Sequence, residues 1–255
     1  MNNLEGYKEH LIALGYSPTT INYYLHYASK LGEVTQDNID SIINIYNHNQ
    51  TRAALQSYVV DYLQRYDIKI KFAPKVLKNK RIGLSPLEWG FFTDKLNKRD
   101  ILIARVLKES GFRVSEILGV PFDEEKGLKP SSIDKPEKGY LWVKIKGRRW
   151  DKALISDELR ADLLKYIEKN HIKGDERIFN IYSRMLWQIF NKVSAEAGIR
   201  HVHPHLLKHT TSRDCDEKGI SIDGKLVILH EKRAQTIIDH YHNPESKKIW
   251  EKLRS

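Results

Sequence analysis

The chain has 255 residues, which is long enough for two domains, and its 43 lysine and arginine residues outnumber 33 acidic residues to give a formal charge of +10. This cationic surplus indicates a polyanionic partner, with nucleic acid as the first candidate and an acidic membrane surface as the second. The single cysteine, Cys215, excludes an intrachain disulfide and a cysteine-based zinc finger. Because the chain starts without an apolar signal core and its apolar runs are short or broken by charges, we expect a cytoplasmic protein without a membrane partner.

Residues 1–66 are predicted to form a small helical domain. Apolar residues recur there at helical spacing, and Ser17-Pro18 is a typical helix start. The last two helices are expected over residues 37–46 and 51–66. The tyrosines of this domain could contact DNA, but aromatic residues at helical spacing are more often core residues.

Residues 67–84 are predicted to form an extended basic linker. Asp67 is the only acidic residue in this segment, which contains Pro74 and shows no clear periodicity. A flexible, solvated tether would have this composition. Given the net charge, we favour a strap that lies along a phosphate backbone. Its predicted DNA-binding residues are Lys69, Lys71, Lys75, Lys78, Lys80 and Arg81.

A second domain is predicted over residues 85–255. It opens at Ser85-Pro86-Leu87-Glu88, which has the pattern of a capping box with proline at the first helical position. Asp100 is expected to cap the next helix, over residues 101–110. Further helices are expected over residues 157–169 and 183–197.

Arg113 follows the second of these helices. Its guanidinium has two plausible roles: a surface ion pair with Glu116, three positions on, or a planar fork held out for two phosphate oxygens.

A β-hairpin is predicted over residues 140–155, with a turn at residues 147–151 between two runs of strand-forming residues. The tip of the hairpin has two interpretations. It is either a solvated basic loop or a segment that reaches into a groove and places one lysine at the reacting groups. The cations near the tip are Lys144, Lys146, Arg148, Arg149 and Lys152.

The most unusual stretch is residues 203–211, which packs three histidines and a lysine into seven positions. Proline suits the first turn of a helix, so Pro204 predicts a helix that carries His205, Lys208 and His209 on one face. A metal site is the weaker interpretation, because zinc needs a third ligand and no glutamate lies inside the His-x-x-x-His pair. A solvated face is as plausible as a functional one on this motif alone. We predict no metal and no cofactor.

The order of these features resembles the tyrosine recombinase family, also called phage-type integrases. The residues that carry the resemblance are Gly-Phe-Arg113-Val-Ser-Glu116, the hairpin Lys146-Gly147, Pro204-His205-Leu-Leu-Lys208-His209-Thr, His230 and Tyr241. The resemblance implies a mainly α fold with a small β-hairpin (α+β) in two domains: a helical, SAM-like core-binding domain and a catalytic domain. The sequence after Ile238 is more similar to integrases of archaeal viruses and plasmids.

The resemblance also implies the roles of the site residues. Tyr241 would attack the phosphorus and form a 3′-phosphotyrosyl link, a step that needs assistance because a free phenol has a pKa of about 10. Arg113 and Lys208 would hold the non-bridging oxygens. His205 would be the general base or a phosphate donor, and Lys146 the general acid.

Three departures from the family pattern bear on these roles. The family usually has arginine where this chain has Lys208, and Gly-His where this chain has Leu229-His230. The interval from His230 to Tyr241 is also a little longer than usual. Either His230 or Lys232 would therefore supply the remaining phosphate contact. The other DNA-binding residues expected near the site are Arg148, Arg149, Lys232 and Arg233.

The function that the resemblance implies is that of a site-specific DNA recombinase or integrase. Its partner would be double-stranded DNA with a specific recombination site, bound by a homotetramer, with the tail from Pro244 packed on a neighbouring protomer or on its own chain. Two alternatives remain: an architectural DNA-binding protein with weak or no cleavage, since lysine lacks the bidentate fork of arginine, and a type IB topoisomerase.

Overall fold

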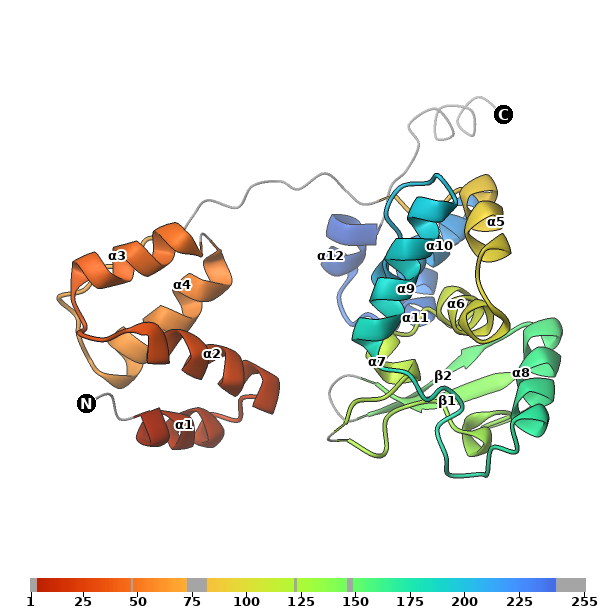
Figure 1. Ribbon diagram of the computed structural model, residues 1–255, viewed down its shortest axis with the longest axis horizontal. Coiled ribbons are helices and arrows are strands. Elements are labelled where there is room, and N and C mark those ends of the chain that lie inside the picture. Colours follow the sequence, from red (N-terminus) through yellow and green to blue (C-terminus); the bar gives the residue numbers. More distant parts are fainter. Residues whose placement is uncertain (1–3, 47, 73–81, 122, 146–148, 242–255) are drawn as a thin grey trace. The chain divides into compact units, whose positions relative to one another are not determined.

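The computed structural model describes residues 4–46, 48–72, 82–121, 123–145 and 149–241. By contacts, the chain divides into two compact units, residues 1–78 and 79–255, drawn in red to orange and in yellow to blue in Figure 1. Several residues named above lie outside the described ranges: Lys75, Lys78, Lys80, Arg81, Lys146, Arg148 and the tail from Pro244.

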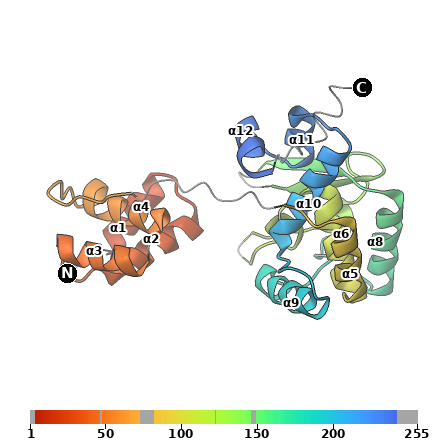
Figure 2. The same ribbon diagram turned by 90° about the horizontal axis from the view of Figure 1, so that it is seen from above.

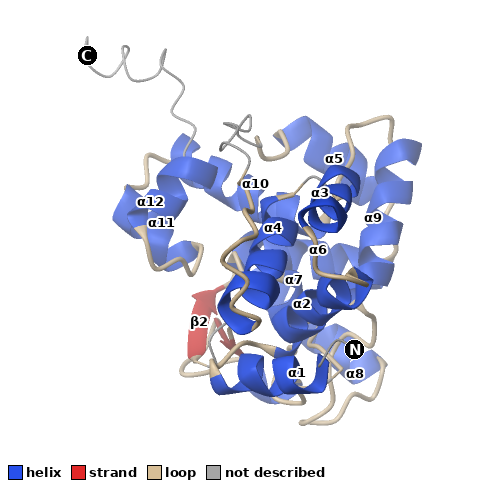
Figure 3. Cartoon of the chain, turned by 90° about the vertical axis from the view of Figure 1, so that its left-hand side faces the viewer, coloured by secondary structure: helices blue, strands red, loops and turns tan. Residues whose placement is uncertain are grey.

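The prediction of a mainly α chain with one small β-hairpin is confirmed. Helices make up most of the described structure, and its two strands pair with each other (Figure 3). No helix in the described ranges has the length and apolarity needed to cross a membrane.

The first unit is built from short helices around an aromatic core. Tyr7, Tyr27 and Tyr58 are buried there, so these tyrosines are core residues. The last helix begins at Asn49 and passes into a π-helical segment that ends at Tyr62. The elements are α1 (Leu4–Ala13), α2 (Pro18–Lys30), α3 (Gln36–Ile45), α4 (Asn49–Gln56) and the π-helical η1 (Ser57–Tyr62).

The backbone at the start of the predicted linker is bound to this helical unit. The side chain of Gln36 accepts from the Lys69 N–H at 2.9 Å and donates to the Lys69 carbonyl at 3.0 Å. The buried Arg52 donates to the Lys71 carbonyl at 2.8 Å. Lys69 and Lys71 are themselves exposed, so their ammonium groups remain accessible to a polyanion.

The second unit packs its helices around a large apolar core that includes Phe92, Leu107 and Phe190. Within it, α6 and α10 lie side by side (Figures 1 and 2). The helical elements are α5 (Pro86–Asp94), α6 (Lys98–Ser110), α7 (Val114–Ile117), η2 (Pro130–Ser132), α8 (Asp157–Lys169), α9 (Ser183–Glu196), α10 (Pro204–Glu217), α11 (Ile222–Ile228), α12 (Ala234–Thr236) and η3 (Ile237–Tyr241).

One predicted helix cap is present and another is wrong. Ser85 and Glu88 form the capping box, since the Glu88 N–H donates to Ser85 Oγ at 3.2 Å and the Ser85 N–H to Glu88 Oε2 at 2.8 Å. Helix α6, however, begins three residues before its predicted start and is capped by Asn97, whose Oδ1 accepts from the Asp100 N–H at 3.0 Å. Both residue types suit a cap, and Asp100 occupies the third helical position instead.

The hairpin consists of β1 (Tyr140–Lys144) and β2 (Trp150–Leu154), paired antiparallel with Tyr140 opposite Leu154. The return strand starts two residues before its predicted first residue, so Asp151 lies in β2 and not in the turn. The rings of Trp142 and Trp150 stack across the pair, with centroids 6.1 Å apart, which favours this longer pairing.

The start of the second unit lies against α10. The Leu84 N–H donates to Thr210 Oγ1 at 2.9 Å. A Cβ added at Gly83 would lie 2.4 Å from Thr210 Cα and 2.5 Å from the His209 carbonyl, so only glycine fits this close approach. The segment that enters the unit therefore braces the helix that carries His205 and Lys208.

Candidate active site

Arg113 is positioned by the end of α6 and the start of α7. Gly111 ends α6 in the left-handed conformation (φ 68°), and a Cβ there would lie 2.3 Å from the Ile228 carbonyl. The chain then turns so that the Arg113 N–H donates to Glu116 Oε2 at 2.7 Å. The Arg113 guanidinium also donates to Glu116 Oε1 at 3.4 Å, which is the ion pair that the sequence spacing indicated.

Helix α10 places His205 and Lys208 one turn apart, with Pro204 at its first position as predicted. Leu206 is buried in the core. The Lys208 side chain is only 1% exposed, and its Nζ donates to the Leu229 carbonyl at 2.5 Å. Burial lowers the pKa of Lys208, and the nearby positive charge of Arg113 acts in the same direction.

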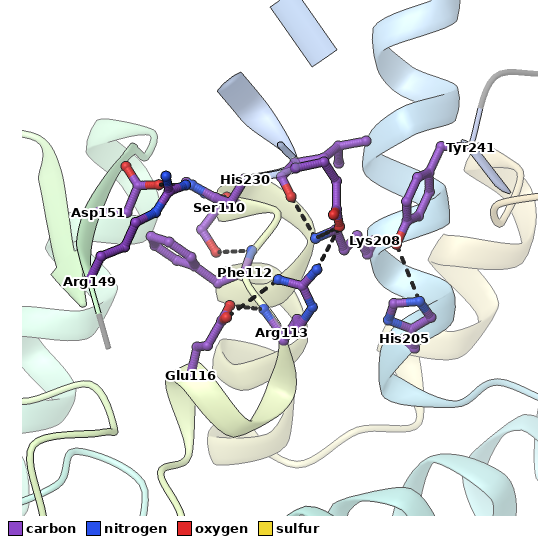
Figure 4. A network of polar contacts seen from close by, with 12 residues as sticks. Ser110, Phe112, Arg113, Glu116, Arg149, Asp151, His205, Lys208, His230 and Tyr241 are labelled. Carbon is purple, nitrogen blue, oxygen red and sulfur yellow. Dashed lines mark hydrogen bonds and ion pairs between the residues drawn. The ribbon is translucent and has the colours of Figure 1, made fainter. Parts of the chain in front are cut away.

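Tyr241 reaches this helix from η3. Its hydroxyl lies 3.3 Å from Nε2 of His205, and its backbone carbonyl accepts from Ser212 Oγ at 3.0 Å (Figure 4). Lys208 Nζ lies 5.7 Å from the centre of the tyrosine ring. Burial raises the pKa of Tyr241 to about 12, with a further contribution from the charge of Glu231, so the phenol is protonated at neutral pH.

Glu231 joins the two cations of the site. Its Oε1 accepts from Arg113 Nη2 at 2.7 Å and lies 2.8 Å from Lys208 Nζ. The Glu231 side chain is 11% exposed, so these charge-assisted contacts are largely shielded from water.

His230 points to a different set of partners. Its Nδ1 lies 3.1 Å from Asp151 Oδ2, its Nε2 lies 3.0 Å from the Ser110 carbonyl, and its ring stacks on Phe112. Both neighbouring oxygens are acceptors, and a neutral ring can donate to only one of them. Burial outweighs these contacts and lowers the pKa of His230.

Four of the predicted catalytic residues therefore meet in one place: Arg113, His205, Lys208 and Tyr241 (Figure 4). His230 contacts Asp151 and Ser110 instead of this group. Among the predicted DNA-binding residues, Lys232 and Arg233 are exposed beside the site, and Arg149 is exposed on the hairpin, 3.4 Å from Asp151.

Sequence reasoning missed Glu231 and Asp151. An acidic residue next to His230 was visible, but nothing local indicated that its carboxylate would lie between Arg113 and Lys208. Asp151 was assigned to a turn, and its pairing with His230 spans 79 positions. Clusters of three or more metal-ligating side chains are absent from the described ranges.

This arrangement suits nucleophilic attack on an anionic ester. A phenol in contact with an imidazole has a route for its proton. A guanidinium and an ammonium beside it can stabilise the charge that develops on a phosphate in the transition state.

Comparison with known proteins identifies the family of this chain. The chain belongs to the phage integrase family, whose family model matches residues 91–247. That match covers more than half of the chain and contains the four residues that meet at Tyr241.

Two curated relatives are tyrosine recombinases. XerD of Neisseria meningitidis is 24% identical over 135 residues, which cover 49% of this chain and 43% of XerD. A tyrosine recombinase of Pseudothermotoga lettingae is 25% identical over 161 residues, which cover 60% of this chain and 52% of that protein. The chain thus spans about half the length of the curated relatives that it matches.

Solved structures share the fold. A lambda integrase dimer (residues 75–356) bound to a core site matches with a TM-score of 0.70 and 18% identity, over 96% of this chain and 95% of that chain. At this level of identity, the likeness concerns the fold alone.

Proposed function

We propose that this chain is a site-specific DNA recombinase that cleaves and rejoins DNA strands through a covalent 3′-phosphotyrosyl intermediate. The observation that carries the proposal is the contact between Tyr241 and His205, 3.3 Å apart, beside the cations of Arg113 and Lys208. Membership in the phage integrase family supports the same chemistry.

In the proposed reaction, the Tyr241 oxygen attacks a phosphorus of the DNA backbone. His205 accepts the phenol proton, because its Nε2 is the ring nitrogen that faces the hydroxyl. Arg113 and Lys208 bind the non-bridging oxygens and stabilise the added charge. The 5′ oxygen leaves, and we assign its protonation to Lys146, which lies outside the described residues.

The proposed partner is double-stranded DNA that carries a specific recombination site, bound by four copies of the chain in the cytoplasm. The formal charge of +10 and the exposed Lys69, Lys71, Arg149, Lys232 and Arg233 support binding to a polyanion. We assign residues 1–66 to core binding and residues 85–255 to catalysis, with the basic segment between them on the DNA backbone.

Trapping of a covalent protein–DNA complex tests the proposal. The chain is incubated with a library of nicked duplexes in which cleavage releases a short strand and prevents rejoining. Wild type is expected to form a complex that survives denaturation and whose DNA reveals the site. Tyr241→Phe should bind the same DNA but form no such complex.

The two alternatives give different results in this assay. An architectural DNA-binding protein would bind DNA without a covalent complex. The structure lends this alternative some support, because the buried Lys208 lacks the fork of arginine and already contacts Leu229 and Glu231. A type IB topoisomerase would form the complex but no Holliday junction between two sites.

A further inference from the structure

One carboxylate contacts both cations that the proposed reaction requires, and Arg113 also contacts Glu116. Glu231 Oε1 lies 2.7 Å from Arg113 Nη2 and 2.8 Å from Lys208 Nζ. The side chain of Glu231 is 11% exposed, that of Arg113 27% and that of Lys208 1%. Arg113 and Lys208 are therefore occupied by an internal anion in the DNA-free chain.

The backbone holds Glu231 in this position. His230 adopts a left-handed conformation (φ 53°) two residues after the end of α11, and its ring contacts Asp151 and Ser110. The Glu231 N–H in turn donates to the Leu226 carbonyl at 3.0 Å. The carboxylate thus approaches the cations from a braced turn.

A carboxylate oxygen and a non-bridging phosphate oxygen form equivalent charge-assisted hydrogen bonds to a guanidinium or an ammonium. Two anions that share the same pair of cations repel each other strongly where little water screens them. A phosphate group that reaches Arg113 and Lys208 must therefore displace the carboxylate of Glu231.

We propose that Glu231 is a built-in substitute for the DNA phosphate, which keeps Arg113 and Lys208 occupied until a phosphodiester of double-stranded DNA displaces it. This inference rests on the proposed function, because it concerns the same site. Part of the DNA-binding energy is then spent on expelling the carboxylate before cleavage.

The test compares Glu231→Gln with Glu217→Gln. The amide keeps the size of the side chain and removes its charge. Glu217 also lies on a salt bridge, 2.8 Å from Arg213 at the end of α10, so its replacement makes the same change in net charge away from the site. Both are made in a Tyr241→Phe chain, and binding of inorganic phosphate and of a mixed-sequence duplex is measured by phosphorus NMR and fluorescence anisotropy.

Glu231→Gln is expected to bind both probes about 10-fold more tightly than Glu217→Gln, because only the first change removes the competing anion. With the tyrosine present, it should also form the covalent complex faster at limiting DNA. Equal affinities in the two variants, or weaker binding by Glu231→Gln in a chain that unfolds at the wild-type temperature, would overturn the inference.

Should Glu231→Gln not fold, Glu231→Asp carries the same test, since the shorter side chain cannot contact both cations and should tighten phosphate binding to a smaller degree. The two proposals fail separately. Tighter phosphate binding without any covalent complex in wild type would leave the inference standing and refute the proposed function. A covalent complex in wild type, without any gain in phosphate affinity in Glu231→Gln, would support the proposed function and refute the inference about Glu231.

Discussion

The hydroxyl of Tyr241 lies 3.3 Å from Nε2 of His205, although 36 positions separate the two residues in the chain. The contact joins η3 to the first turn of α10. It also brings the phenol to the helix that carries Lys208, whose Nζ lies 5.7 Å from the tyrosine ring. The phenol, the imidazole and the ammonium to which we assign the reaction thus belong to one folded unit.

Replacement of His205 should slow cleavage without loss of DNA binding. We expect His205→Asn to reduce the rate of covalent complex formation about 100-fold, because the phenol loses the imidazole to which we assign its proton. The matched control is His201→Asn, because His201 is an exposed histidine just before α10. This variant should cleave at the wild-type rate. A single-turnover assay with the trapped substrate measures both, and equal rates would refute the role of His205.

Lys208 should tolerate arginine but not an uncharged residue. Lys208→Arg keeps the charge and replaces the single ammonium nitrogen with a planar fork of donors, so cleavage should be preserved or raised. Lys208→Met keeps the apolar stem, loses the ammonium, and should cleave about 100-fold more slowly or worse. A collapse of activity in a well-folded Lys208→Arg chain would show that Lys208 does not bind the phosphate.

His230 should make the protein less stable in mild acid. Burial lowers its pKa below the ordinary 6.5, so the unfolded chain binds this proton more readily than the folded chain. The resulting stability is present above pH of about 6.5 and is lost as the pH falls towards the lowered pKa. The midpoint of chemical denaturation should therefore decrease from pH 7 to pH 5.

His230→Gln should remove part of that decrease. His171→Gln is the matched control, because His171 has the same left-handed φ of 53° but is exposed. An unchanged pH dependence in His230→Gln would contradict the assignment.

Two glycines should respond in opposite ways to alanine. At Gly83 the added methyl would overlap the backbone of α10, so Gly83→Ala should destabilise the chain by about 1–3 kcal/mol. At Gly90, inside α5, the added carbon would meet no atom within 4 Å beyond its chain neighbours and the backbone of its own helix, and Gly90→Ala should stabilise the chain by about 0.5–1 kcal/mol. Thermal unfolding measures both, and a Gly83→Ala chain as stable as wild type would show that α10 is not braced in this way.

The parts of the fold that depend on short-range pattern could be predicted from the sequence. Pro204 and the spacing of His205 and Lys208 indicate a helix with one polar face, and Ser85-Pro86 marks a helix start. Asp100 was misassigned because Asn97, three residues earlier, is an equally good cap. The choice between two such caps depends on how the helix packs in the folded unit, and this packing cannot be inferred from the residues around the cap.

The parts of the site that depend on long-range contacts could not be predicted. The position of Glu231 follows from the left-handed turn at His230, and that turn is stabilised by Asp151 on the hairpin and Ser110 on α6. None of these partners is a neighbour in the sequence. The resemblance to a family supplied the roles proposed for Arg113 and Tyr241 and left the remaining phosphate contact open between His230 and Lys232. It gave no sign that the His230 ring contacts Asp151 and Ser110.

The placement of Tyr241 against His205 of its own chain has a genetic consequence. If each copy cuts with its own tyrosine, the intact tyrosine of one inactive variant cannot act in the site of a second inactive variant. A mixture of Tyr241→Phe and Arg113→Ala chains should then form no more covalent complex than either variant alone. Complementation in that mixture would mean that the tyrosine of one copy enters the site of another.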